Sequence, residues 1–240
     1  MAIEITAEEI KGWFATFMSI LFTPRSAKPG DSLTTIILSE TRAFGPSPIT
    51  GGVIHKINAV TAETVALAIE EAAPILQAVL KGDIEESVAF LAAGICGESR
   101  FDPNAINPNL NKFKHGETVN EAFGRHDLGI AQFSARVVSL DPGMAGLTNE
   151  QIQTKAMDVN FAIPRFAHCV AKLLTDTRNE VLADSSLLNN VPNKDVHILA
   201  LEGYNTGEHG AKLREQADET MTYGSNWVAK ATSYLKILKG

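Results

Sequence analysis

Cysteine and clustered positive charge are both scarce in this sequence. Only two of its 240 residues are cysteines, Cys96 and Cys169, and their spacing matches neither a zinc site nor a redox motif. Lysine and arginine total 21 against 28 aspartates and glutamates, which gives a net charge of −7 with no long basic run to offset it. These absences exclude a disulfide framework and disfavour nucleic-acid binding through a basic face.

Long apolar runs are also missing. The longest approach to one, residues 13–22, is interrupted by Thr16 and Ser19 and is too short to cross a bilayer. The first nine residues are acidic where a secretory signal would be basic, and no small-residue cleavage site follows the apolar stretch. We therefore expect no helical membrane span and no signal peptide, so delivery to any site outside the cytoplasm would need another route.

Helical periodicity is the strongest pattern that the sequence does contain. Thr6 and Glu9 form a capping-box pattern, and apolar residues at helical spacing follow until Pro24. Packing of this first helix against the protein is favoured over contact with a membrane, because its polar face carries only Lys11 as a base. Similar periodicity predicts helices at residues 59–80, with a kink at Pro74, and at 84–97, 151–174, 196–202 and 227–238.

Loop-forming residues and a second capping pattern divide the chain. Residues 24–58 hold most of the early proline and glycine, and residues 101–123 are rich in asparagine and proline. Asp83 and Glu86 predict the start of the helix that ends near Glu98. We expect a mainly α protein with a helical N-terminal region, residues 1–82, that serves packing, docking or targeting, and a second domain, residues 83–240.

Glu98 is the first candidate for chemistry. It ends an apolar helix and precedes Phe101, so desolvation and the negative end of the helix dipole both favour its protonated form. Both effects raise the pKa of a carboxyl group, and a carboxylic acid that keeps its proton near neutral pH can serve as a general acid. A glutamate at a helix end is more often solvated, so the surrounding motifs decide its role.

Four short motifs follow one another from Glu98 onward. They read ESRFDPNA from Glu98, GIAQFS from Gly129, MDVN up to Asn160 and LEGYNTG around Tyr204, and a late tyrosine, Tyr223, comes after them. In this order they resemble the E-S-x-F-x-P-x-A, G-L-M-Q, helical N-I and A-x-Y-N-x-G motifs of lytic transglycosylases and goose-type lysozymes, glycoside hydrolase family 23. The resemblance covers residues 83–240 and implies a lysozyme-like α-helical domain there.

The resemblance implies cleavage of peptidoglycan glycan strands without a metal or a cofactor. Glu98 would protonate the glycosidic oxygen of the β-1,4 bond between N-acetylmuramic acid and N-acetylglucosamine, and would then act as a base. In a transglycosylase that base takes a proton from the muramic C6 hydroxyl and a 1,6-anhydro end forms, whereas in a lysozyme it activates water. The residues implied to support or bind the sugar are Ser99, Gln132, Phe133, Asn160, Tyr204, Asn205 and Tyr223.

Asp127 leaves the choice between these two reactions open. The run DLGIAQ from Asp127 also resembles the D-x-G-x-x-Q run of chicken-type lysozymes, whose aspartate is the second catalytic carboxylate. A retaining hydrolase needs such a partner about 5 Å from the acid. Many lytic transglycosylases carry an acidic residue here and still use one essential glutamate, and we favour this single-acid interpretation.

Two positions depart from the family pattern. Ala131 stands where the family usually has methionine, which predicts altered sugar contacts rather than altered chemistry. Glu202 stands where small apolar residues are usual, so an extra carboxylate lies either near the site or in solvent. His115, His126 and His209 lack the spacing of metal ligands, so no metal site is predicted from them.

Other functions stay open beside peptidoglycan cleavage. A lysozyme-like fold can serve as a non-catalytic structural component of a virion or secretion apparatus. Chitin, another N-acetylglucosamine polymer, is an alternative substrate for the same catalytic acid. The missing signal peptide and the appended N-terminal region favour a phage lysis or virion-associated enzyme that acts on the wall in the periplasm. Residues 1–82 would then contact a virion or secretion-apparatus partner.

Overall fold

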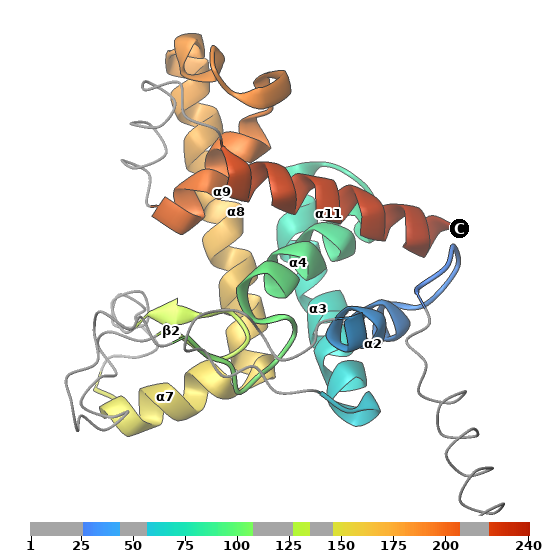
Figure 1. Cartoon of the computed structure of the whole chain (residues 1–240). Coiled ribbons are helices and arrows are strands. Elements are labelled where there is room, and N and C mark those ends of the chain that lie inside the picture. The colour runs from blue at the N-terminus through green and yellow to red at the C-terminus, as the bar shows by residue number, and fades with distance from the viewer. Residues whose placement is uncertain (1–25, 44–56, 108–126, 135–145, 207–220) are drawn as a thin grey trace, which may run out of the picture.

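The computed structural model describes residues 26–43, 57–107, 127–134, 146–206 and 221–240, and within them the protein is mainly α-helical (Figure 1). The first predicted helix, residues 6–24, lies outside these ranges. No helix in the described parts is long and apolar enough to cross a membrane. The elements are α2 (Leu33–Ala43), α3 (Ala59–Leu80), α4 (Ile84–Ser99), β1 (Ile106–Asn107), β2 (Asp127–Leu128), β3 (Phe133–Ser134), α7 (Asn149–Met157), α8 (Val159–Ala183), the 3₁₀ turns η4 (Ser185–Leu188) and η5 (Pro192–Lys194), α9 (Val196–Thr206) and α11 (Thr222–Lys239).

Local capping sets the helix boundaries. The Asp83 side chain accepts a hydrogen bond from the Glu86 amide at 2.9 Å and begins α4, as the sequence predicts. The predicted helix at 151–174 is instead two helices, because Asp158 ends α7 and its side chain accepts from the Asn160 amide to begin α8. Helix α3 covers the predicted range 59–80 and contains Pro74.

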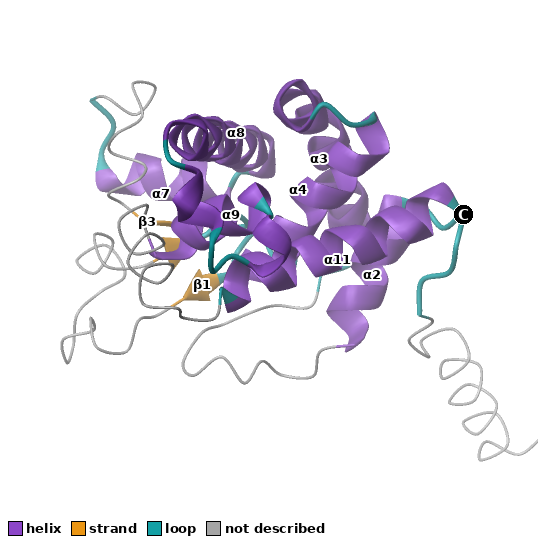
Figure 2. Ribbon diagram, turned by 90° about the horizontal axis from the view of Figure 1, so that it is seen from above, coloured by secondary structure: helices purple, strands orange, loops and turns teal. Residues whose placement is uncertain are grey.

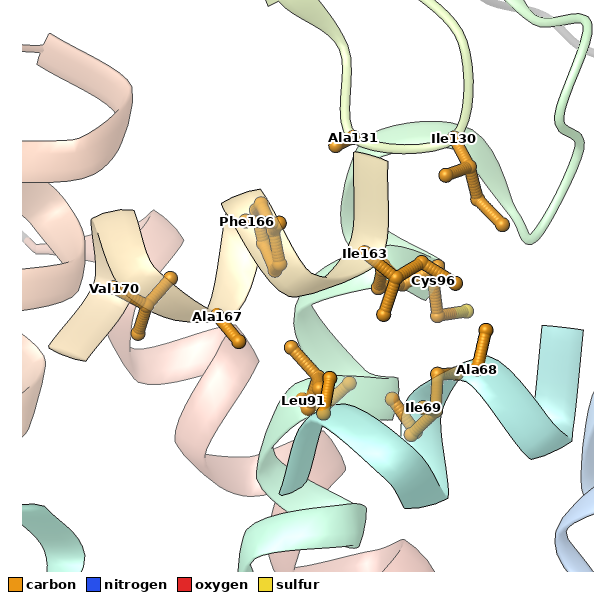
Figure 3. Close-up of a cluster of buried hydrophobic side chains, with 14 of the residues drawn as sticks. Ala68, Ile69, Leu91, Cys96, Ile130, Ala131, Ile163, Phe166, Ala167 and Val170 are labelled. Carbon is orange, nitrogen blue, oxygen red and sulfur yellow. The ribbon is translucent and has the colours of Figure 1, made fainter. Parts of the chain in front are cut away.

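Helix α4 lies at the centre of the molecule. Every residue from Ser87 to Cys96 is buried, and α4 packs against α3 and α11, while α8 packs against α3 and α9. In Figure 1 α11 crosses α4, and Figure 2 shows the same helices from above. Apolar side chains of α3, α4 and α8 meet in this core, and Ile130 and Ala131 reach it from the strand region (Figure 3).

The described part of the N-terminal region shares this core. Leu33, Ile36 and Ile37 of α2 are buried in the same hydrophobic cluster as the residues of α4, α8 and α11. The Gly30 amide also donates to the Ile237 carbonyl near the end of α11 at 2.7 Å. Residues 26–43 and 57–82 therefore pack on the remainder of the protein.

A small antiparallel sheet lies beside α7 (Figure 2). Its strand order is β1-β2-β3, with Asn107 opposite Asp127 and Asp127 opposite Ser134. The turn between β2 and β3 begins at Gly129, whose φ is +71°. A Cβ at Gly129 would lie 2.0 Å from the Ala156 carbonyl oxygen of α7, so only glycine lets the turn approach the helix this closely.

Candidate active site

Glu98 lies in the last turn of α4, where the sequence places it. The helix ends at Arg100 in a left-handed conformation, and Phe101, also left-handed, turns the chain toward β1. The Tyr223 hydroxyl of α11 donates a hydrogen bond to Glu98 Oε1. Burial raises the pKa of Glu98 to about 7, Tyr223 lowers it and the charge of Asp127 raises it further. Near neutral pH this carboxyl group can both give and take a proton.

An aromatic cluster supports Tyr223. Trp227 lies beneath it, with ring centroids 5.9 Å apart at 79°, and the Trp227 indole donates to the Phe90 carbonyl at 2.7 Å. Tyr204 and Phe166 pack on the same indole, at 6.1 and 5.6 Å between centroids. These contacts place both tyrosines against one rigid surface next to Glu98.

Tyr204 connects α9 to the turn between β2 and β3. Its hydroxyl donates to the Ala131 carbonyl at 3.2 Å. Burial raises the pKa of Tyr204 well above its usual range, and the charges of Glu98 and Asp127 raise it further. Tyr204 therefore stays a neutral hydrogen-bond donor near Glu98.

Gln132 closes the turn between β2 and β3. It adopts a φ of +48°, and its Nε2 donates to the Gly129 carbonyl at 2.7 Å and to the Ala105 carbonyl at 3.3 Å. These bonds connect the turn to the segment that follows Glu98. The Gln132 amide group therefore stabilises the backbone around the site. Asp127, partly buried on β2, lies one residue before the end of the strand that leads into this turn.

The other predicted site residues fall into three groups. Ser99 is fully buried and donates to the Ile95 carbonyl at 3.3 Å, and Phe133 is also buried, so both support the site from inside. Asn160 is exposed in the first turn of α8. The Asn205 side chain lies outside the described residues. The structure therefore brings Glu98, Asp127, Tyr204 and Tyr223 together.

Glu202 is the main feature that the sequence alone left undecided. Its side chain is fully buried rather than in solvent, and Oε2 accepts a hydrogen bond from the Gly224 amide in the first turn of α11 at 3.0 Å. The sequence signal was the unusual carboxylate ahead of Tyr204, but its partner lies 22 residues away and gives no local pattern.

Metal or thiol chemistry finds no support in the part of the chain that the structure describes. There, no group of three histidines, cysteines or carboxylates could hold a metal ion. His115, His126 and His209 lie outside the described residues. Burial, above all, raises the pKa of Cys96 to about 11, so this thiol stays protonated near neutral pH and is a poor nucleophile.

Comparison with known proteins adds no relative. No family model, no curated protein and no solved structure matches this chain.

Proposed function

We propose that this protein cleaves peptidoglycan glycan strands at the β-1,4 bond between N-acetylmuramic acid and N-acetylglucosamine, as a lytic transglycosylase. The observation that carries the proposal is Glu98, a carboxyl group at the end of a buried helix with a pKa of about 7 and a hydrogen bond from Tyr223. Glycosidases need such an acid, because the leaving oxygen must receive a proton as the bond breaks. The motif resemblance supplies the substrate class.

In the proposed reaction Glu98 first gives its proton to the glycosidic oxygen. The bond from that oxygen to the muramic C1 breaks, and N-acetylglucosamine leaves with a free hydroxyl group. The Glu98 carboxylate then takes the proton of the muramic C6 hydroxyl while O6 bonds to C1, which closes the 1,6-anhydro ring and restores the acid. Tyr223 holds the carboxyl group in place, and the negative charge of Asp127 favours positive charge at C1.

Hydrolysis by a lysozyme-type mechanism is the second candidate, and Asp127 is the observation that favours it. The charge of Asp127 raises the pKa of Glu98, and a retaining hydrolase needs a second carboxyl group near its acid. In this alternative Asp127 is the second carboxylate and water replaces the C6 hydroxyl.

A lysozyme-like architecture is part of the proposal. Three features support it: a buried helix that ends in the acid, a small antiparallel sheet directly after it, and helices that bring two tyrosines to the same carboxyl group. Action on the wall in the periplasm, delivery by a virion or secretion apparatus, and partner contact through residues 1–82 complete the proposal.

Release of dye from labelled, purified peptidoglycan tests the proposed activity. The wild type should release dye, and Glu98→Gln, which keeps the shape but loses the acid, should release it about 10² to 10⁴ times more slowly. Glu40→Gln is the matched control, because Glu40 contacts α11 away from Tyr223. Wild-type activity in the Glu98→Gln variant would refute the enzymatic proposal and favour a structural component. Cleavage of chitin oligomers would instead indicate that chitin is the substrate.

A further inference from the structure

We infer that Glu202 is a positioning residue: by capping the first turn of α11, it holds Tyr223 where its hydroxyl group meets Glu98. This inference rests on the proposed function, in which Glu98 is the acid, and adds to it a residue that does not touch substrate. Glu202 is the position at which the LEGYNTG motif departs from the family pattern.

Glu202 caps the first turn of α11. The first amides of a helix have no partner within the helix, and the residue before α11, Met221, provides no side-chain cap. Glu202 reaches across from α9 and accepts the hydrogen bond of the Gly224 amide, the third residue of α11, at 3.0 Å. A buried carboxyl group at this end of a helix also interacts favourably with the helix dipole.

The contacts of Gly224 with α9 also fix the position of Tyr223. Gly224 packs so tightly on α9 that a Cβ there would lie 2.2 Å from the Ile198 carbonyl oxygen. The turn is therefore fixed to α9 both by the Glu202 hydrogen bond and by backbone packing. Tyr223 directly precedes Gly224, so the same two contacts set the point from which its side chain extends to Glu98.

Glu202 could affect the pKa of Glu98 either through the position of Tyr223 or through its own charge, and the two effects can be distinguished. The pKa of Glu98 depends on its burial, on the Tyr223 hydrogen bond and on the charge of Asp127. Glu202 is not among these causes, although its charge raises the pKa of Tyr223, so we expect Glu202 to act on Glu98 through the position of Tyr223. Since Tyr223 lowers this pKa, loss of the cap should raise it, while loss of the Glu202 charge alone should not.

Titration of the Glu98 carboxyl carbon by NMR tests the inference in four variants beside the wild type. Tyr223→Phe should raise the Glu98 pKa by about one unit, a tenfold change in its ionisation constant. Glu202→Leu removes the cap and should raise it by a similar amount, and Tyr223→Phe combined with Glu202→Leu should raise it no further. Glu202→Gln keeps an acceptor oxygen and should leave the pKa as in the wild type.

Two results would overturn the inference. One is an unchanged Glu98 pKa in folded Glu202→Leu, and the other is an equal shift in Glu202→Gln and Glu202→Leu, which would indicate a charge effect. Should Glu202→Leu fail to fold, hydrogen exchange of the Gly224 amide in the wild type and in Glu202→Gln replaces it. Slow exchange in both is expected, and exchange at the rate of an exposed amide in the wild type would contradict the cap.

These measurements need no substrate, so the two proposals can fail separately. A protein that releases nothing from peptidoglycan but shows the expected pKa pattern would retain the positioning role and lose the proposed activity. A protein whose activity depends on Glu98 but whose Glu98 pKa ignores the Glu202→Leu change would keep the activity and lose the inference.

Discussion

Helix α11 meets α4 through a tyrosine at two places, and the two places differ in charge. Near its start, Tyr223 donates to Glu98, and the described groups that shift the Glu98 pKa include no cation. Farther along, Tyr234 lies beside Cys96 and Glu40, and Lys230 pairs with Glu40 at 3.3 Å. The first place leaves a carboxyl group with a pKa near neutral, whereas the second balances a carboxylate with an ammonium group.

The first place has the features of a reactive site, whereas the second is a structural contact. This contact, here called the brace, is formed by Glu40, Cys96, Lys230 and Tyr234. The brace joins three helices, because Glu40 lies on α2, Cys96 on α4 and Lys230 on α11, and it keeps α2 on the core. The site has the same helix pair, but burial of Glu98 raises the free energy of its ionised form, and no cation among its described partners offsets this cost. The pKa shift of Glu98 is the measure of that cost.

The largest expected effect on stability comes from adding a methyl group to Gly224, where the start of α11 packs tightly on α9. Gly224→Ala would place a Cβ 2.2 Å from the Ile198 carbonyl oxygen, so α11 must shift away from α9. We expect a loss of about 3 kcal/mol in the free energy of unfolding, measured by urea denaturation.

Gly97→Ala is the matched control on α4. Nothing lies within 4 Å of a Cβ at Gly97, and the residue is exposed. A helical alanine there should stabilise the protein by about 0.5 to 1 kcal/mol. Equal stability of the two variants would show that the close approach of α9 and α11 does not exist.

A smaller effect is expected from pH acting on Glu98. Its folded-state pKa, about 7, lies above the ordinary value of 4.5, so its contribution to stability is fully present below pH 4.5 and is lost as pH rises through 7. Glu98→Gln escapes this loss. It should exceed the wild type in free energy of unfolding by about 2 kcal/mol more at pH 8 than at pH 4.5, somewhat less than the full shift because Glu98 as a whole residue is only half-buried.

Calorimetry of both proteins at the two pH values measures this difference. The same pair of scans on Glu40→Gln is the control from the brace. A pH-independent difference between wild type and Glu98→Gln would mean that folding does not shift the Glu98 pKa.

The smallest effect is expected at the brace. Lys230→Met removes the ion pair with Glu40 and the contact of the ammonium group with the Tyr234 ring, 5.6 Å from its centroid. Because both charged side chains are partly exposed, we expect a loss of only about 0.5 to 1 kcal/mol, smaller at high salt. Thermal melts at two salt concentrations measure it, and a loss of wall-cleaving activity without a loss of stability would contradict a purely structural brace.

The sequence predicts the local features of this protein well. Asp83 and the apolar stripe behind it place α4 and deliver Glu98 at its end, because capping and periodicity involve residues only a turn apart. The break at Asp158 escaped prediction, since the apolar period continues across it. The pairings of Glu202 with Gly224 and of Glu40 with Lys230 join distant segments, so only the folded chain shows them.

Mass spectrometry of the products that the wild type and Glu98→Gln release from purified peptidoglycan tests whether Glu98 carries out transglycosylation. We expect wild-type muropeptides that are one water lighter than hydrolysis products and end in 1,6-anhydromuramic acid, and almost none from Glu98→Gln. Reducing ends would make the protein a lysozyme and give Asp127 the second catalytic role. The absence of any product that depends on Glu98, from folded protein, would contradict the account.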